Sequence, residues 1–277
     1  MQKSNTTHTI AAMVFNGDAR PIYQTMVEMN CGLQVICVAR IPWKEFENEE
    51  AVIWYLNEDS YKNQRGILFV KGNGIDDVVD ILRKRILNIE DIAMIIDEST
   101  SKLLHTLSGK RVMNLYKSML EICDDLNIEC PFLTFVNATS LDDRKGAYEE
   151  WFNEKGEHQG HMVWLIGQGY YYMVHSLAHE LRHIYQRQND ENYYKHRITR
   201  NEDVLGYLYS KEEIDADAYG ALVTERLTGK DGMQYVFEDA AEHNLSCWTK
   251  LIGLIKTRMD EIRSQENFFG DKQSKTA

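Results

Sequence analysis

The sequence predicts an α+β fold, in which a small mixed sheet packs on one long helix, further helices follow, and an α/β region comes first. Over about the first 90 residues, short runs rich in β-branched residues alternate with helical patterns. Three further strand candidates lie between residues 132 and 166. From residue 170 onward, apolar residues recur mainly at helical spacing.

The length of 277 residues suits one large domain or two small ones, either of which can bury a core. We expect an α/β region with no assigned role at 1–110 and a second domain at 111–267. The polar residues 268–277 are expected to be a disordered tail.

The composition is typical of a soluble globular protein, with 43% hydrophobic and 27% charged residues. The net charge of −12 would repel phosphate backbones, so nucleic acid is not the expected partner. The five cysteines contain no CxxC pair, which indicates reduced thiols. The N-terminus lacks a signal-peptide pattern, and no apolar run reaches the ~18–20 residues of a membrane span. We therefore expect a soluble, cytoplasmic protein with no membrane partner.

Strands and helices are expected to alternate in the N-terminal region. Pro21 suits the first turn of a helix, where its missing N–H has no cost. The turn at 72–74 lacks the further glycine or Lys-Ser/Thr of a phosphate-binding motif, which favours a plain turn. The predicted strands are 9–15, 33–41 and 66–70, and the predicted helices are 21–30, 42–59 and 75–87.

The middle of the chain changes from a helical pattern to short strands. Residues 89–127 are expected to be largely helical, with an interruption near Ser108-Gly109. Cys130-Pro131 ends that pattern, because the residue before a proline disfavours the helical region. Strands are predicted at 132–136, 145–152 and 161–166, with 154–160 as a hairpin connection.

A long helix is predicted at 170–188, with two distinct faces. One face is apolar and suits packing on a sheet. The other is a polar row, and a purely structural helix has little reason to place so many imidazoles on one line. The apolar face contains Val174, Leu177, Ala178, Leu181, Ile184 and Tyr185, and the polar row contains His175, His179, His183 and Gln186.

This helix contains the sequence AHELRH at 178–183. His179 and His183 are four residues apart, so their side chains lie about 6 Å from each other on one face. Two imidazoles at this spacing can bind one metal ion, and Glu180 can act as a base on a metal-activated water. A catalytic zinc site, however, uses three protein ligands.

The predicted helix at 210–227 offers the third ligand, and two more helices follow at 233–243 and 245–264. Glu213 and Asp217 share one face of that helix, so Glu213 could complete a His₂Glu site. Asp217 could then accept the free ring N–H of a ligand histidine.

Other roles for these acids remain open in the sequence. Ser210 and Glu213 also match a capping box, in which the Glu213 carboxylate folds back onto the Ser210 amide and cannot face a metal. Glu212 and Asp215 are competing ligands on other faces of the same helix.

The two motifs together resemble the gluzincin-like ImmA/IrrE-type metallopeptidases. In that family AHExxH precedes an E-x-x-A-(N/D)-x-F-A helix, and here AHELRH precedes Glu213-x-x-Ala216-Asp217-Ala218-Tyr219. The resemblance covers roughly 113–227 and extends to metallopeptidases found on phages and other mobile elements. The first ~110 residues show no such likeness, and no helix-turn-helix accompanies the motifs.

The resemblance implies a zincin-like catalytic domain. His179, His183 and Glu213 would bind Zn²⁺, and Glu180 would be the general base. Arg182 departs from the family pattern, since a small residue, often Gly, precedes the second histidine in many members. Tyr219 stands where Phe is usual.

The function expected from these features is zinc-dependent hydrolysis of a peptide bond in one specific intracellular protein. An oxyanion donor is also needed, and the sequence does not choose one. The basic and aromatic residues at 193–200 could contact substrate, with nucleic acid as a weaker possibility. The candidate oxyanion or substrate residues are His175, Tyr193, Tyr194, His196 and Tyr219.

Two other classes of protein remain open. The chain could be a non-catalytic, protein-binding regulator whose zinc site is structural or degenerate, with His175 as a fourth ligand. It could also be a helical interaction protein in which AHELRH is coincidental. The sequence does not indicate an oligomeric state.

Overall fold

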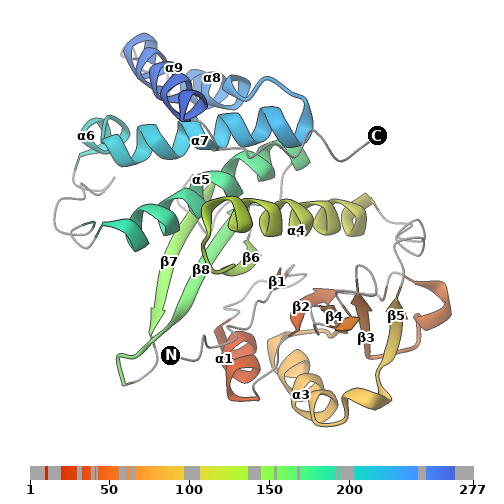
Figure 1. Cartoon of the computed structure of the whole chain (residues 1–277). Coiled ribbons are helices and arrows are strands. Elements are labelled where there is room, and N and C mark those ends of the chain that lie inside the picture. The colour runs from red at the N-terminus through yellow and green to blue at the C-terminus, as the bar shows by residue number, and fades with distance from the viewer. Residues whose placement is uncertain are drawn as a thin grey trace. The chain divides into compact units, whose positions relative to one another are not determined.

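The computed structural model confirms a mixed α+β protein (Figure 1). Its contacts divide the chain into two compact units, which we describe separately. The first unit contains 1–116 and 129–167, and the second contains 117–128 and 168–277, so the division does not follow the boundary expected at residue 110. The structure describes residues 10–11, 20–29, 33–38, 41, 43–55, 61–62, 66–96, 107–136, 145–152, 155–166, 169–190, 193, 203–242 and 248–265.

One four-stranded sheet in the first unit has the order β2-β4-β3-β5. β2 is parallel to β4, β4 is antiparallel to β3, and β3 is parallel to β5. The strands expected near 33–41 and 66–70 are therefore confirmed, with adjusted ends. The bounds are β2 Gln34–Val38, β3 Ala51–Tyr55, β4 Gly66–Lys71 and β5 Ala93–Ile96.

The prediction of a helix at 42–59 is wrong, because Ala51–Tyr55 forms the strand β3. All five residues of this strand are buried, and the strand lies between β4 and β5. A central strand that is buried on both faces has a continuous apolar run without alternation, and such a run cannot be distinguished from a buried helix by periodicity. Of the residues described between 43 and 55, only Lys44–Phe46 forms a helical turn, of the 3-10 type.

The long helix expected at 89–127 is also wrong in its first part. Ala93–Ile96 forms β5, and a 3-10 turn at Ile89–Asp91 precedes it. The α-helix α4 begins at Leu107 and ends at Leu126. The four apolar residues of β5 are too few to show a helical or a strand period. The helical pattern of the neighbouring residues therefore extends the predicted helix over them.

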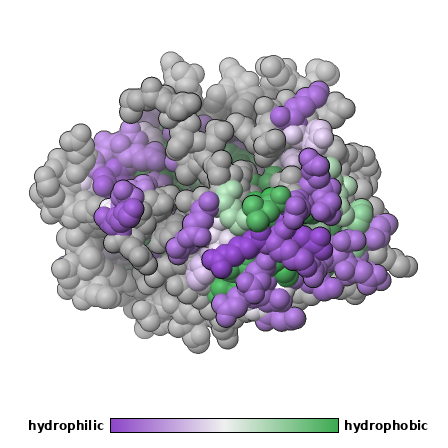
Figure 2. All heavy atoms as spheres, turned by 90° about the horizontal axis from the view of Figure 1, so that it is seen from below, coloured by the Kyte–Doolittle hydropathy of each residue, from purple (hydrophilic) through white to green (hydrophobic). Residues whose placement is uncertain are grey.

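Helices α1 (Arg20–Glu28) and α3 (Ile75–Ile86) accompany this sheet and contact each other. On α3, Asp76 and Asp77 lie in the first turn, and Arg83, Lys84 and Arg85 lie in the last, which suits the helix dipole at both ends. Among the coloured residues on the face shown in Figure 2, hydrophilic side chains predominate, with smaller apolar areas between them. The buried core includes Ile22, Met26, Val35, Ile53, Leu68, Val70, Val78 and Leu82.

A second four-stranded sheet in the same unit has the order β1-β6-β8-β7. β8 is parallel to β6 and antiparallel to β7. The strands expected at 132–136 and 145–152 are confirmed, while the strand expected at 161–166 begins three residues earlier. The bounds are β1 Ile10–Ala11, β6 Phe132–Val136, β7 Gly146–Phe152 and β8 His158–Ile166.

The second unit is helical and is arranged around α7, which contacts α5, α6, α8 and α9. Ser210 caps the N-terminus of α7, and Gly229 ends the helix with a left-handed φ of 66°. No helix in the described part of the chain combines the length and apolar composition needed to cross a membrane. The bounds are α5 Tyr170–Asn189, α6 Val204–Leu208, α7 Lys211–Thr228, α8 Met233–Glu242 and α9 Trp248–Ser264.

Helix α5 is buried on more than its apolar face. Val174, Leu177 and Leu181 are fully buried, as expected. His175 and His183, which belong to the polar row, are 0% and 1% exposed. The reason is that α7 packs along α5, so the polar row forms a second interface and not a surface.

The contact between α7 and the start of α8 depends on Gly232. A Cβ atom at this position would lie 2.0 Å from the backbone oxygen of Ala221. We expect Gly232→Ala to lower the free energy of unfolding by about 3 kcal/mol, because the backbones must separate. Gly253→Ala is the matched control, since nothing lies within 4 Å of its added Cβ. Gly253→Ala should raise the free energy of unfolding by about 0.5–1 kcal/mol, because alanine favours the helix α9. Urea titrations measure both variants.

Candidate metal centre

Three side chains from α5 and α7 converge at one point. His179 Nε2 lies 3.1 Å from His183 Nε2 and 3.2 Å from Glu213 Oε2, and His183 Nε2 lies 3.3 Å from Glu213 Oε1. Ligand atoms about 2.1 Å from a tetrahedral ion lie about 3.4 Å from one another. The donor set and its spacing therefore fit a divalent zinc ion. Within the described part of the chain, this group contains no fourth histidine, cysteine or carboxylate.

The capping alternative for Glu213 is resolved by its backbone. The Ser210 hydroxyl accepts a hydrogen bond from the Glu213 amide at 3.3 Å, so Ser210 is the N-cap. The Ser210 amide donates to the Tyr207 carbonyl at 3.0 Å, however, and not to the Glu213 side chain. The Glu213 carboxylate faces the two histidines instead. Only half of the capping box forms.

Asp217 fixes the orientation of His179. The Nδ1–H group of His179 donates to Asp217 Oδ1 at 2.8 Å, which leaves the Nε2 lone pair directed at the metal centre. Burial disfavours the charged form of His179, but the Asp217 and Glu213 carboxylates outweigh it and raise the pKa of His179 well above its usual value. Burial likewise opposes ionisation of Glu213, yet His183 and His179 lower the pKa of Glu213 well below 4.5. The centre therefore attracts a positive charge.

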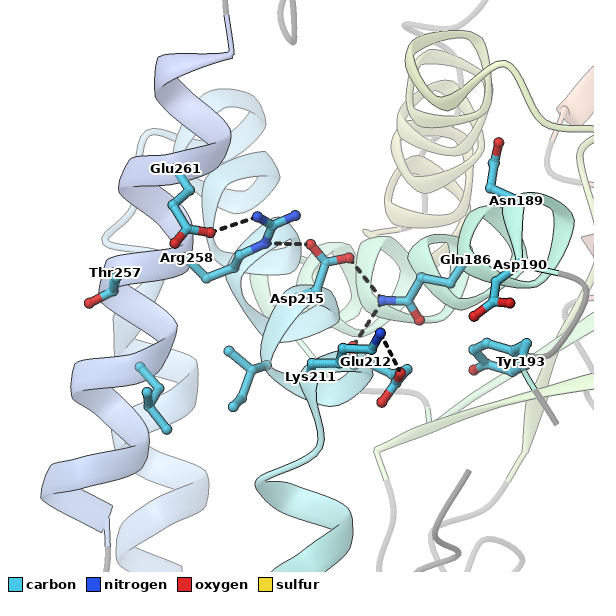
Figure 3. A pocket seen from close by; sticks show the side chains of 12 residues that line it. Gln186, Asn189, Asp190, Tyr193, Lys211, Glu212, Asp215, Thr257, Arg258 and Glu261 are labelled. Atoms are coloured by element: carbon cyan, nitrogen blue, oxygen red, sulfur yellow. Dashed lines mark hydrogen bonds and ion pairs between the residues drawn. The ribbon is translucent and has the colours of Figure 1, made fainter. Parts of the chain in front are cut away.

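Gln186 plays the corresponding role for His183. Its amide nitrogen donates to the Glu212 carbonyl and to Asp215 Oδ2, both at 2.9 Å, which assigns Oε1 as the atom facing His183 (Figure 3). His183 Nδ1–H then donates to Gln186 Oε1 at 2.9 Å, and Nε2 stays free to bind an ion. The sequence placed Gln186 on the polar row but gave it no role.

Asp215 is occupied by two arginines and does not compete as a ligand. Arg182 contacts both oxygens of Asp215, at 2.7 and 3.1 Å, and Arg258 of α9 approaches at 2.8 Å (Figure 3). Burial raises the pKa of the Asp215 carboxyl, but Arg182, Gln186 and Arg258 outweigh this and keep the net shift downward. Arg182, which departs from the small residue of the family pattern, also lies over the Tyr185 ring at 4.4 Å.

The other competing acid, Glu212, is also directed elsewhere. Its carboxylate lies 3.9 Å from the Lys211 ammonium, and its carbonyl oxygen accepts from Gln186. A cavity of about 540 Å³ lies beside this region, between α5, α7 and α9. Gln186, Asp215 and Arg258 are among the described residues that line it, whereas the three converging ligands are not.

The structure does not bring His175 into the centre. Its ring is fully buried and stacks on Tyr235 of α8, with 4.0 Å between the ring centroids. Its Nε2 atom lies 3.9 Å from Asp217 Oδ1, the same oxygen that accepts from His179 Nδ1. Burial lowers the pKa of His175, and the nearby Asp217 opposes this only in part. His175 is not in the group formed by His179, His183 and Glu213, so it packs on Tyr235 and is not a fourth ligand.

The tyrosine candidates differ in position. Tyr193 is buried, and its hydroxyl lies 3.2 Å from His183 Nδ1, the ring nitrogen that faces away from the ion site. Tyr219 is fully buried beneath the Arg182 guanidinium at 5.2 Å, and burial raises the pKa of its hydroxyl. Neither hydroxyl has the position expected of an oxyanion donor. Tyr194 and His196 lie outside the described residues.

Glu180 follows the first ligand histidine and is buried, with 7% of its surface exposed. Because Glu180 is one residue after His179, its side chain points about 100° around the α5 axis from that of His179.

Comparison of the chain with models of protein families, with curated proteins and with solved structures finds no match. The interpretation of the centre therefore depends on its own geometry.

The role of Asp217 can be tested through metal affinity. Asp217→Asn keeps the shape of the side chain but removes the charge that orients His179, so we expect zinc to bind about 10–100-fold more weakly. Asp260→Asn on α9 is the matched control, because its side chain is 77% exposed. Competition with a chromophoric chelator measures both. Equal affinities for the two variants would contradict the role.

The Arg182–Asp215 pair can be tested through stability. Its two side chains are 6% and 12% exposed, so Arg182→Met leaves a buried carboxylate with Arg258 as its main cationic partner. We expect a loss of about 3 kcal/mol in the free energy of unfolding. The surface pair Arg263–Glu225 is the control, and Arg263→Met should cost less than about 1 kcal/mol. A similar, small cost for both variants in urea titrations would show that the buried pair contributes little.

Proposed function

We propose that this chain is a zinc-dependent peptidase that uses Glu180 as a general base. The observation that carries the proposal is the convergence of His179, His183 and Glu213 at separations of 3.1–3.3 Å, with the second nitrogen of each histidine already engaged. A set of two histidines and one glutamate with an open fourth position is typical of catalytic and not of structural zinc sites.

Bound zinc would lower the pKa of a water molecule and polarise the scissile carbonyl. The Glu180 carboxylate would take the proton from the attacking water and return it to the leaving amine. Asp217 and Gln186 would hold the two imidazoles in the tautomer that keeps Nε2 unprotonated. Glu213, held ionised by its neighbours, would supply the negative charge of the ligand set.

The motif resemblance supports a zincin-like domain of the ImmA/IrrE type, and with it a protein substrate cleaved at one or a few sites. One departure from the family pattern, Arg182, is compatible with this proposal. Arg182, where that family often has Gly, is buried against Asp215, and the half-buried Arg258 pairs with the same carboxylate. The departure is thus compensated locally and leaves the ligand set intact.

The test compares Glu180→Gln with the unchanged chain. We expect the variant to retain one zinc ion at the centre but to lose about 10²–10⁴-fold in cleavage rate, because only proton transfer is removed. A random-sequence peptide library and labelling of new N-termini in a cell extract provide the substrates. Glu90→Gln, at an exposed position, is the control and should cleave normally.

Two outcomes would contradict the proposal. Cleavage at an undiminished rate by Glu180→Gln would assign the activity to another group. Absence of cleavage by the unchanged chain, with zinc bound, would favour the regulator whose zinc site is structural.

A further inference from the structure

The hairpin of β7 and β8 contains a second group of ligand-type side chains, in the first unit. Glu150, His158 and His161 each place one donor atom within 4.8 Å of the other two. The Nε2 atom of His158 lies 3.9 Å from Glu150 Oε1, and the two imidazole centroids are 4.9 Å apart. This is the same donor set as in the centre on α5 and α7, built on a different scaffold.

A β-bulge brings these three residues to one face. Glu150 is directly opposite His161 in the antiparallel register, so their side chains share a face. His158 is three residues from His161 and would face the other side of a regular strand. The register shifts between Trp151 and Phe152, where β8 contributes one extra residue, and this turns His158 back to the face of His161. From the sequence alone, the spacing of His158 and His161 predicts side chains on opposite faces of a strand. The bulge in the structure places them on the same face.

The surroundings of His161 also suit a ligand. Only 8% of His161 is exposed, and its Nδ1 atom lies 3.2 Å from the Tyr148 hydroxyl. With Nδ1–H donating to that oxygen, Nε2 is the nitrogen directed at an ion, as Asp217 and Gln186 arrange for the histidines of α5. The His158 side chain is 43% exposed and can move the short distance needed to approach Glu150.

We propose that Glu150, His158 and His161 form a second metal site, which takes a divalent transition-metal ion of the zinc class. Two imidazoles and one carboxylate favour such an ion over Ca²⁺ or Mg²⁺, which prefer oxygen ligands. The ion cross-links the two strands at the end of the β7–β8 hairpin, because Glu150 comes from β7 and both histidines come from β8. Among the described residues the group has three members, which leaves the fourth position of the ion to water or to a side chain of another molecule.

Zinc titration of the chelator-treated full chain tests the proposal. We expect two equivalents of Zn²⁺ for the unchanged chain, one for His158→Ala, one for His179→Ala, and none for the two changes combined. His158 is chosen because it is the exposed member, so its loss does not endanger folding. Glu157→Gln, an exposed change on the same hairpin, is the control and should bind two equivalents.

Glu150→Gln separates a built site from adventitious binding to one surface histidine. We expect Glu150→Gln to weaken the affinity of the hairpin site for Zn²⁺ at least about 10-fold. If Zn²⁺ bound to His158 alone, the same change would leave the affinity unaltered. The proposal is overturned if the only equivalent in the unchanged chain is the one that His179→Ala removes, or if Glu150→Gln has no effect. A single equivalent that His158→Ala removes would support the hairpin site and contradict the centre on α5 and α7.

Discussion

The packing of α7 on α5 is the constraint on which the rest of the second unit depends, because it buries charges that need partners. Three acids of α7, Glu213, Asp215 and Asp217, are all largely enclosed. Burying a carboxylate is costly unless a cation or hydrogen-bond donor compensates it. Glu213 and Asp217 face the histidines of α5, and Asp215 turns to two arginines. Each of the three carboxylates thus has a cationic or hydrogen-bonding partner within the second unit.

The close approach of α5 and α7 at Gly220 leaves little room for a side chain. A Cβ atom at Gly220 would lie 3.1 Å from both Nε2 and the backbone oxygen of His175. The His175 ring of α5 is therefore enclosed between Gly220 of α7 and Tyr235 of α8, on whose ring it stacks. His175 therefore acts as a packing element, although it lies on the same row of α5 as His179 and His183. Position on a helical row does not by itself assign chemistry.

The parts of the site that depend on local spacing could be predicted from the sequence, and the parts that depend on tertiary contacts could not. Spacing within α5 places His179 beside His183, and spacing within α7 places Glu213 beside Asp217. Arg258 reaches Asp215 across 43 residues, and no local pattern indicates that contact. The buried strand β3 was mistaken for a helix for a related reason: its neighbours β4 and β5, and not its own period, determine its form.

The network around Asp215 connects His183 to α9 through three consecutive hydrogen bonds. His183 Nδ1 is held by Gln186, Gln186 is held by Asp215, and Asp215 is held in turn by Arg258. Hydrogen bonds in such a chain polarise one another in a buried environment, so the loss of one weakens the next. The orientation of His183 on α5 therefore depends on a residue of α9. A truncation that removed α9 would alter the candidate metal centre without removing any of the three side chains that converge there.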